Sequence, residues 1–141
     1  MSARPLIGLI GENIALSLAP ALHEDAFAAH GLEGRYHLIE FAKRDRRTLQ
    51  QALDGARAVG MLGVNITHPF KEAVLALLDR VADTAREAGA VNTVVFEADG
   101  GSHGYNTDRG GFRAALPAEL GEGAARGRTV LVLGAGGAGC A

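Results

Sequence analysis

Short apolar runs alternate along this chain with segments in which apolar residues recur at helical spacing. The runs predict strands at Leu6–Ile10, Arg35–Phe41, Leu62–Ile66, Val91–Glu97, His103–Tyr105 and Thr129–Leu133. The intervening segments predict helices over residues 20–30, 45–59, 69–78, 81–88 and 108–116. Strands that are joined by helical crossovers form a mainly parallel sheet with helices on both faces, so the pattern predicts an α/β domain.

Residue types at the segment ends support this assignment. Asp45 and Thr67 are typical helix N-caps, and Asp99-Gly100-Gly101 is typical of a hairpin turn. Apolar stripes predict the buried face of two helices, with Leu22, Ala26 and Ala29 in the first and Leu49, Leu53 and Ala56 in the second.

Composition narrows the class of protein. Of 141 residues, 48% are apolar and 21% are charged, and the formal net charge is −2, so a basic nucleic-acid-binding surface is not expected. The lone cysteine, Cys140, cannot form an internal disulfide, which favours a reducing compartment. The chain shows neither a signal-peptide pattern nor the roughly 18-residue apolar run of a membrane span. We expect a cytoplasmic protein with no nucleic-acid and no membrane partner.

A glycine-rich loop lies near the end of the chain. Gly134-Ala135-Gly136-Gly137-Ala138-Gly139 follows a predicted strand and matches G-x-G-x-x-G, whose glycines let backbone amides approach a pyrophosphate closely. A glycine-rich turn without a ligand is the competing interpretation. Because one strand and part of a loop cannot complete a nucleotide-binding fold, we expect residues 129–141 to begin a truncated Rossmann domain. Residues 1–118 then form a separate domain, and residues 119–128 are a connector.

Lys71 lies in the first turn of the predicted helix over residues 69–78, at a junction that also carries Asn65 and Thr67. The positive end of a helix dipole opposes a charged amine, so a lysine there is suited to exchanging a proton with a substrate hydroxyl. A solvated surface lysine is the alternative.

Asp108 follows the predicted strand His103–Tyr105 and is placed to cap the next helix, which is its alternative role. Ligands of open α/β sheets gather at the carboxyl ends of strands, and both Lys71 and Asp108 follow such ends. If the two meet, the carboxylate orients the ammonium group and favours its charge. Asn92, near the start of the predicted strand Val91–Glu97, is either an amide ligand or a buried, hydrogen-bonded residue.

Ser17 follows the first strand, again at the edge where ligands gather. It can donate to a carboxylate near the start of the helix that Pro20 begins, where backbone amides also favour an anion. Initiation of that helix is the competing explanation. The five histidines show no paired spacing of a zinc site, so no metal is expected.

Taken in order, five blocks of this sequence resemble the shikimate dehydrogenase family. They are Ser17 with Pro20 and His23, Asn65-Ile66-Thr67 with Pro69 and Lys71, Ala90-Val91-Asn92-Thr93, Asn106-Thr107-Asp108, and the glycine loop. The resemblance implies NADP-dependent, reversible reduction of 3-dehydroshikimate to shikimate, a step toward chorismate and the aromatic amino acids. It implies that the present chain holds the substrate-binding domain, and that a following Rossmann domain binds the nucleotide.

The resemblance also implies roles for single residues. Lys71 and Asp108 match the catalytic pair, and the substrate-binding positions are Ser17, Asn65, Thr67 and Asn92. The glycines that match the cofactor loop are Gly134, Gly136, Gly137 and Gly139.

One position departs from the family pattern. Ala19 stands where the family usually has a second hydroxyl residue two positions after Ser17. This departure keeps two alternatives open. One is an enzyme that acts on both quinate and shikimate, often with NAD, and the other is a ligand-binding module without catalysis. The sequence also leaves open whether the protein is a monomer or a homodimer.

Overall fold

The computed structural model describes residues 4–41, 46–121, 123, 126–134, 136, 138 and 139, without the side chains of residues 46 and 47. Its strands are β1 (Leu6–Gly11), β2 (Arg35–Glu40), β3 (Gly63–Ile66), β4 (Arg80–Val81), β5 (Thr93–Phe96) and β6 (Ser102–Tyr105). Its helices are α1 (Ala19–Ala29), α2 (Arg46–Ala58), the 3₁₀ helix η1 (Ala73–Leu77), α3 (Asp83–Ala88) and α4 (Asp108–Leu120). Asp45, the predicted cap of α2, lies outside the described residues.

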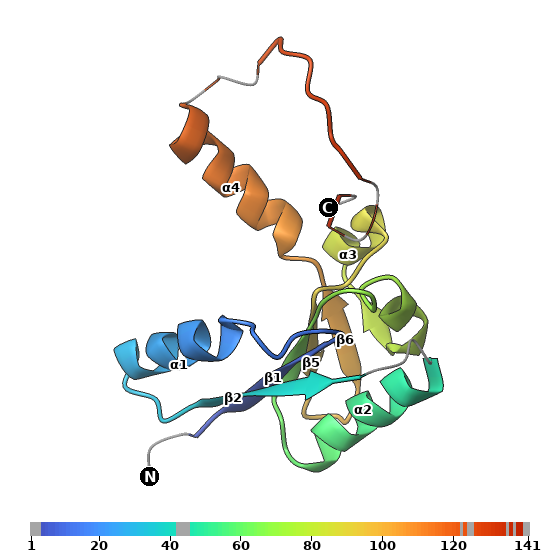
Figure 1. The fold of residues 1–141 in the computed structure, drawn as a ribbon. Helices are drawn as coiled ribbons and strands as arrows, with labels where there is room; N and C mark the ends of the chain where they lie inside the picture. Colours follow the sequence, from blue (N-terminus) through green and yellow to red (C-terminus); the bar gives the residue numbers. More distant parts are fainter. Residues whose placement is uncertain are drawn as a thin grey trace.

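The six strands form one sheet in the order β2-β1-β3-β5-β6-β4 (Figure 1). β1 is parallel to β2 and β3, and β6 is parallel to β4, whereas β5 is antiparallel to both of its neighbours. The α/β class with a mainly parallel sheet is therefore confirmed. The predicted hairpin turn joins β5 to β6, where Glu97 N donates to Gly101 O at 2.9 Å.

The reversal at β5 changes which residues share an edge of the sheet. It brings the amino end of β5 to the same edge as the carboxyl ends of β1, β3 and β6. We call this the carboxyl edge, and the opposite one, where β1 and β2 begin, the amino edge. Residues just before β5 thus join residues that follow β3 and β6.

The main core lies between one face of the sheet and α2, η1 and α3. The predicted stripe of α2 is confirmed, because Leu49, Leu53 and Ala56 are all buried. They pack with Ile10, Val64, Ile66, Phe70, Val74, Ala85, Val91 and Val94. This core anchors three of the strands that reach the carboxyl edge.

The other face of β1 and β2 is covered by α1, on the opposite side of the sheet from α2 (Figure 1). The predicted buried stripe of α1 is wrong: no residue of α1 is buried, and Leu22 is 68% exposed. The helix instead turns a different face to the sheet. Ala19 packs on the smaller cluster of Leu9, Ile14 and Tyr36, and the His23 ring stacks on the Tyr36 ring.

The helix predicted over residues 69–78 is also wrong. Phe70 N donates to Thr67 O at 2.9 Å, which closes a tight turn, and a regular helix is limited to the five residues of η1. The Lys71 carbonyl, which an α-helix would use internally, accepts from Val91 N at 2.8 Å. A hydrogen bond to a residue 20 positions further along the chain therefore replaces the helical one here. The helix predicted over residues 81–88 is shorter, because β4 precedes α3, and α4 extends past residue 116 to Leu120.

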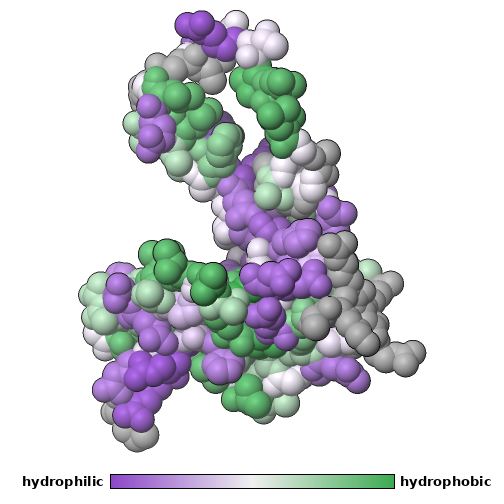
Figure 2. Space-filling model, viewed as in Figure 1, coloured by the Kyte–Doolittle hydropathy of each residue, from purple (hydrophilic) through white to green (hydrophobic). Residues whose placement is uncertain are grey.

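The strand predicted at Thr129–Leu133 is wrong in this chain. Residues 128–134 form no strand, and Val130, Leu131, Val132 and Leu133 are each at least 64% exposed. A strand needs a neighbour for its backbone groups, and the described part of the chain provides none. Figure 2 shows apolar residues both on α4 and on this extended segment. Among the described helices, none is long and apolar enough to cross a membrane.

Candidate functional site at the carboxyl edge

Backbone hydrogen bonds bring three chain junctions together at the carboxyl edge. Asn92, just before β5, accepts from Ile66 N at 2.8 Å and donates through its own N to Tyr105 O at 3.0 Å. Its neighbour Val91 donates to Lys71 O at 2.8 Å. The end of β3, the start of β5 and the end of β6 are thereby fixed relative to one another, and so are the side chains that they carry.

Lys71 and Asp108 form an ion pair across this edge. Lys71 Nζ donates to Asp108 Oδ2, and the two side chains are 17% and 37% exposed. The predicted meeting of these residues is confirmed. An ammonium group has three hydrogens, so Lys71 can offer others to a ligand while it holds Asp108.

The predicted electrostatic reason for Lys71 is wrong, although the pairing is right. Residues 68–72 form a turn, so Lys71 does not lie in the first turn of an α-helix. Asp108 does, at the start of the 13-residue helix α4, where the helix dipole favours a carboxylate. The helix dipole of α4 therefore stabilises the carboxylate of Asp108 and does not act on Lys71 as predicted.

Asp108 does not cap α4, because both of its carboxylate oxygens bind other side chains. The residue at the N-cap position, Thr107, forms no side-chain capping bond either. Asn106 takes this part: its Oδ1 accepts from Arg109 N at 3.2 Å, and its Nδ2 donates to Ala90 O at 3.0 Å. The sequence patterns alone did not lead to this buried residue. An Asn two residues before a predicted helix is close enough to cap its N-terminus, and this signal could have indicated Asn106.

Asn92 is a buried amide that uses its full hydrogen-bonding capacity within the protein. Its Nδ2 donates to Asp108 Oδ1 at 2.7 Å and to Thr107 Oγ1 at 2.8 Å. Its Oδ1 accepts from Thr107 N at 3.0 Å and from Thr93 Oγ1 at 2.9 Å. The structure thus shows the buried, hydrogen-bonded alternative, in which Asn92 holds Asp108. Contact between Asn92 and a substrate stays a prediction.

Asn65 is held by residues that the sequence patterns did not single out. Tyr36 Oη donates to Asn65 Oδ1 at 2.9 Å, and Asn65 Nδ2 donates to Thr93 Oγ1 at 3.2 Å. Burial raises the pKa of the Tyr36 hydroxyl to about 12, so this group is a neutral donor at physiological pH. Asn65 Oδ1 has a second lone pair, which suits it to accept from a ligand hydroxyl.

Thr67 and Ser17 lie after β3 and β1, on the same edge. A Cβ on Gly11 would lie 2.4 Å from the Thr67 methyl carbon and 2.8 Å from that of Ile14, so only glycine lets these two chain segments approach. Ser17 Oγ accepts from Ala19 N at 3.2 Å, which supports the competing explanation that it initiates α1. The structure brings Ser17 to the edge, where this hydrogen bond joins it to α1 and not to the Lys71–Asp108 pair.

The glycine loop returns to this site. A hollow of about 420 Å³ is lined by Thr67, Lys71 and the loop glycines Gly134, Gly136 and Gly139. Gly134 has φ +111°, a conformation that favours glycine, and a Cβ on Gly136 would meet no atom within 4 Å. Gly137, which was also predicted to bind cofactor, lies outside the described residues.

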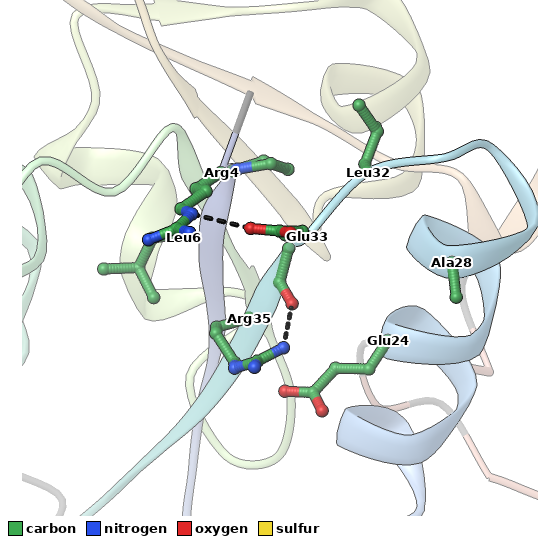
Figure 3. Close-up of a pocket in the computed structure, with 9 residues that line it drawn as sticks. Arg4, Leu6, Glu24, Ala28, Leu32, Glu33 and Arg35 are labelled. Atoms are coloured by element: carbon green, nitrogen blue, oxygen red, sulfur yellow. Dashed lines mark hydrogen bonds and ion pairs between the residues drawn. The ribbon is translucent and has the colours of Figure 1, made fainter. Parts of the chain in front are cut away.

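A second hollow, of about 590 Å³, lies at the amino edge between α1 and the starts of β1 and β2 (Figure 3). Arg4 Nε donates to Glu33 Oε2 at 2.7 Å across it, and Arg35 donates to Gly34 O at 3.0 Å. None of the predicted site residues lines it. In the described ranges, no three His, Cys, Asp or Glu side chains gather as metal ligands would.

Comparisons with known proteins agree on one family. A profile of the shikimate dehydrogenase substrate binding domain matches residues 9–94. A quinate/shikimate dehydrogenase (NAD(+)) of Corynebacterium efficiens is 50% identical over 136 residues, which are 95% of this chain and 47% of that protein. A shikimate dehydrogenase (NADP(+)) of Symbiobacterium thermophilum is 48% identical over 133 residues, 94% of this chain and 43% of that protein.

A solved structure extends the comparison to the fold. Shikimate 5-dehydrogenase of Thermus thermophilus, in complex with NADP(H) and shikimate, superposes with a TM-score of 0.81 at 40% identity. The superposition covers 96% of this chain and 49% of that one. This chain therefore spans about half the length of the relatives it matches.

Proposed function

This chain belongs to the shikimate dehydrogenase family, and on that premise we propose that it is the substrate-binding half of an NADP-dependent enzyme that reversibly reduces 3-dehydroshikimate to shikimate. That reaction is a step toward chorismate and the aromatic amino acids. The observation that carries the proposal is the partly buried Lys71–Asp108 pair at the carboxyl edge, whose lysine lines the same hollow as the glycine loop. A cytoplasmic location remains a prediction of the sequence, which leaves the choice between monomer and homodimer open.

Lys71 is the proton donor in this proposal. A bound nicotinamide nucleotide supplies hydride to the ring carbonyl carbon, and Lys71 Nζ gives a proton to the carbonyl oxygen, which becomes the hydroxyl. Asp108 Oδ2 holds Nζ in place and stabilises its charged form before transfer. In the oxidation direction, the amine of Lys71 takes the hydroxyl proton.

The other predicted residues bind the substrate, position the Lys71–Asp108 pair or begin the nucleotide-binding domain. Thr67, which lines the hollow with Lys71, and Asn65 are proposed to bind ring hydroxyls, and Asn92 contributes by fixing Asp108 Oδ1. Ser17, on the loop after β1, is proposed to bind the substrate carboxylate. The loop glycines Gly134, Gly136, Gly137 and Gly139 are proposed to open a nucleotide-binding domain that begins at residue 129, after a connector over residues 119–128.

A second candidate is an NAD-dependent quinate/shikimate dehydrogenase. Two observations favour it: Ala19 removes the second hydroxyl of the carboxylate site, and the relative that is 50% identical carries that name. Quinate and shikimate share the carboxylate and ring hydroxyls, so the same edge can serve both. The two candidates differ in substrate range and cofactor, not in the role of Lys71.

The test compares two proteins. One is the 141-residue chain, and the other, called the two-domain form below, is this chain continued by a complete nucleotide-binding domain, its own or that of the Corynebacterium efficiens relative. Oxidation of shikimate and of quinate is measured with NADP and with NAD. We expect the two-domain form to oxidise shikimate and the 141-residue chain to be inactive while binding shikimate weakly.

Each result separates the candidates. NADP-linked oxidation of shikimate alone supports the first, and NAD-linked oxidation of both substrates supports the second. Absence of all four activities in a folded two-domain form contradicts both and leaves a ligand-binding module. Activity in the 141-residue chain would contradict the proposed division into domains.

A further inference from the structure

One line of side-chain hydrogen bonds crosses the sheet to the Lys71–Asp108 pair. Tyr36 Oη on β2 donates to Asn65 Oδ1 at 2.9 Å, and Asn65 Nδ2 on β3 donates to Thr93 Oγ1 at 3.2 Å. Thr93 Oγ1 on β5 donates to Asn92 Oδ1 at 2.9 Å, and Asn92 Nδ2 donates to Asp108 Oδ1 at 2.7 Å. We call this the amide line. All four bonds donate toward Asp108.

Two backbone groups fix the direction of the amide line. The Asn92 carbonyl can only accept, and Asn65 Nδ2 faces it at 3.4 Å. The Thr107 backbone N–H can only donate, and Asn92 Oδ1 faces it at 3.0 Å. Each amide therefore has one orientation, which fixes the donors and acceptors of its side-chain bonds.

Thr93 lies between the two oriented amides, so its hydroxyl has a single arrangement. It accepts from Asn65 and donates to Asn92, and the cross-strand register, which pairs Asn65 with Thr93, places it there. The hydroxyl of a serine or a threonine can both accept and donate in this way. A valine, which has the same shape but no hydroxyl, can do neither, and it would leave Asn65 Nδ2 and Asn92 Oδ1 each without one hydrogen-bond partner.

We propose that Thr93 is a positioning residue for the Lys71–Asp108 pair, and that Tyr36 is the distal end of the same device. Hydrogen bonds that donate in one direction polarise one another, so each strengthens the next. The amide line holds Asn92 so that its Nδ2 fixes Asp108 Oδ1, which leaves Oδ2 for Lys71. As a claim about proton transfer, the inference rests on the proposed function.

The first experiment measures shikimate oxidation by the two-domain form carrying Thr93→Val, Thr93→Ser or the distant control Thr48→Val on α2. We expect Thr93→Val to lower kcat about tenfold with a smaller change in KM, because the positioning of the transferring groups is lost. Thr93→Ser is expected to recover most of the rate, and Thr48→Val to keep it. An unchanged kcat in Thr93→Val, or equal losses in the valine and serine variants, would overturn the proposal.

The second experiment does not depend on activity. The side-chain amide signals of Asn65 and Asn92 and the ammonium nitrogen of Lys71 are followed by ¹⁵N NMR in the 141-residue chain. We expect Thr93→Val to shift all three, and Tyr36→Phe to shift Asn65 strongly and Asn92 less. If Thr93→Val fails to fold, the Tyr36→Phe variant tests the proposal instead. An Asn92 signal that does not shift in the Tyr36→Phe variant would overturn the proposal that the amide line couples Tyr36 to Asn92. A two-domain form that oxidises neither substrate, with these shifts present, would contradict only the proposed function.

Discussion

Two ion pairs, one at each edge of the sheet, differ in their exposure to water and in the groups around them. At the amino edge, Arg4 and Glu33 are 78% and 57% exposed (Figure 3). At the carboxyl edge, Lys71 and Asp108 are 17% and 37% exposed, and Asp108 also accepts from a buried amide. An exposed pair of the first kind contributes about 0–1 kcal/mol to stability. Shielding from water and support by neutral groups therefore distinguish the candidate site, not the presence of opposite charges.

The hollows beside the two pairs differ in the same way. The amino-edge hollow is larger, at about 590 Å³ against about 420 Å³ at the carboxyl edge. Its polar residues bind one another or nearby backbone, whereas the carboxyl-edge hollow is lined by Thr67 and Lys71, from the junction after β3, and by the glycine loop. Lys71 in turn binds Asp108, from the junction after β6. A ligand site needs convergent polar groups as well as volume.

The largest expected difference between the edges is catalytic. In the two-domain form, Lys71→Ala should lower kcat for shikimate oxidation by about 10²–10⁴-fold, the usual contribution of a general acid or base. Arg4→Ala should leave kcat unchanged, because its ion pair lies at the other edge. Steady-state kinetics with both variants checks this, and near-normal turnover of Lys71→Ala would remove the lysine from the mechanism.

Alanine variants of two buried glycines distinguish an effect on stability from an effect on shikimate binding. Gly11→Ala at the carboxyl edge and Gly34→Ala at the amino edge each place a Cβ within 2.4 Å of another side chain, the Thr67 methyl carbon and the Phe27 ring respectively. Each should lower the free energy of unfolding by about 1–3 kcal/mol, as overpacking does. Only Gly11→Ala should also weaken shikimate binding, because Thr67 must move. Denaturant unfolding and calorimetry measure the two effects, and equal loss of binding in both variants would contradict this assignment.

Ala19→Ser tests the departure from the family pattern. A restored hydroxyl can donate one charge-assisted hydrogen bond to a substrate carboxylate, worth about 1.5–3 kcal/mol. Shikimate binding by the 141-residue chain should therefore tighten about tenfold or more by titration calorimetry. Unchanged affinity would show that Ser17 and backbone amides are sufficient for the carboxylate.

The smallest expected effect concerns Tyr36 and high pH. Burial raises its pKa from 10.0 to about 12, so folding disfavours the ionised phenol. Its contribution to stability is complete below about pH 10 and is lost as the pH rises from there toward 12. Ultraviolet titration should show a tyrosinate transition near pH 12 that Tyr36→Phe removes. If the transition persists in that variant, the hydroxyl is not the buried donor of the amide line.

The meeting of Lys71 and Asp108 could be predicted because both follow strands that point the same way. Contacts that depend on register could not. Thr93 meets Asn65 only because β3 and β5 are antiparallel neighbours with those residues paired, and Tyr36 reaches Asn65 from β2 across β1. The residue types of Thr93 and Tyr36 do not by themselves predict such a contact.

The wrong predictions have a common physical cause. Residues 69–78 are helical in pattern, but Val91 N takes the Lys71 carbonyl, and Thr129–Leu133 is apolar like a strand but meets no neighbour among the described residues. The stripe of α1 failed because the His23 ring packs on Tyr36 and sets which face the helix presents. In the first and third cases a contact with a residue distant in the sequence overrides the local pattern, and in the second the contact that a strand needs is missing.

The most direct test of the central claim is a map of where shikimate binds on the 141-residue chain. Backbone and lysine ¹⁵N signals are recorded during a titration with shikimate. Our account predicts that signals of Ser17, Thr67, Lys71 and Asp108 shift together with one affinity while those of Arg4 and Glu33 stay still. Shifts gathered around Arg4 and Glu33, or a saturating concentration of shikimate that leaves Lys71 unmoved, would contradict it.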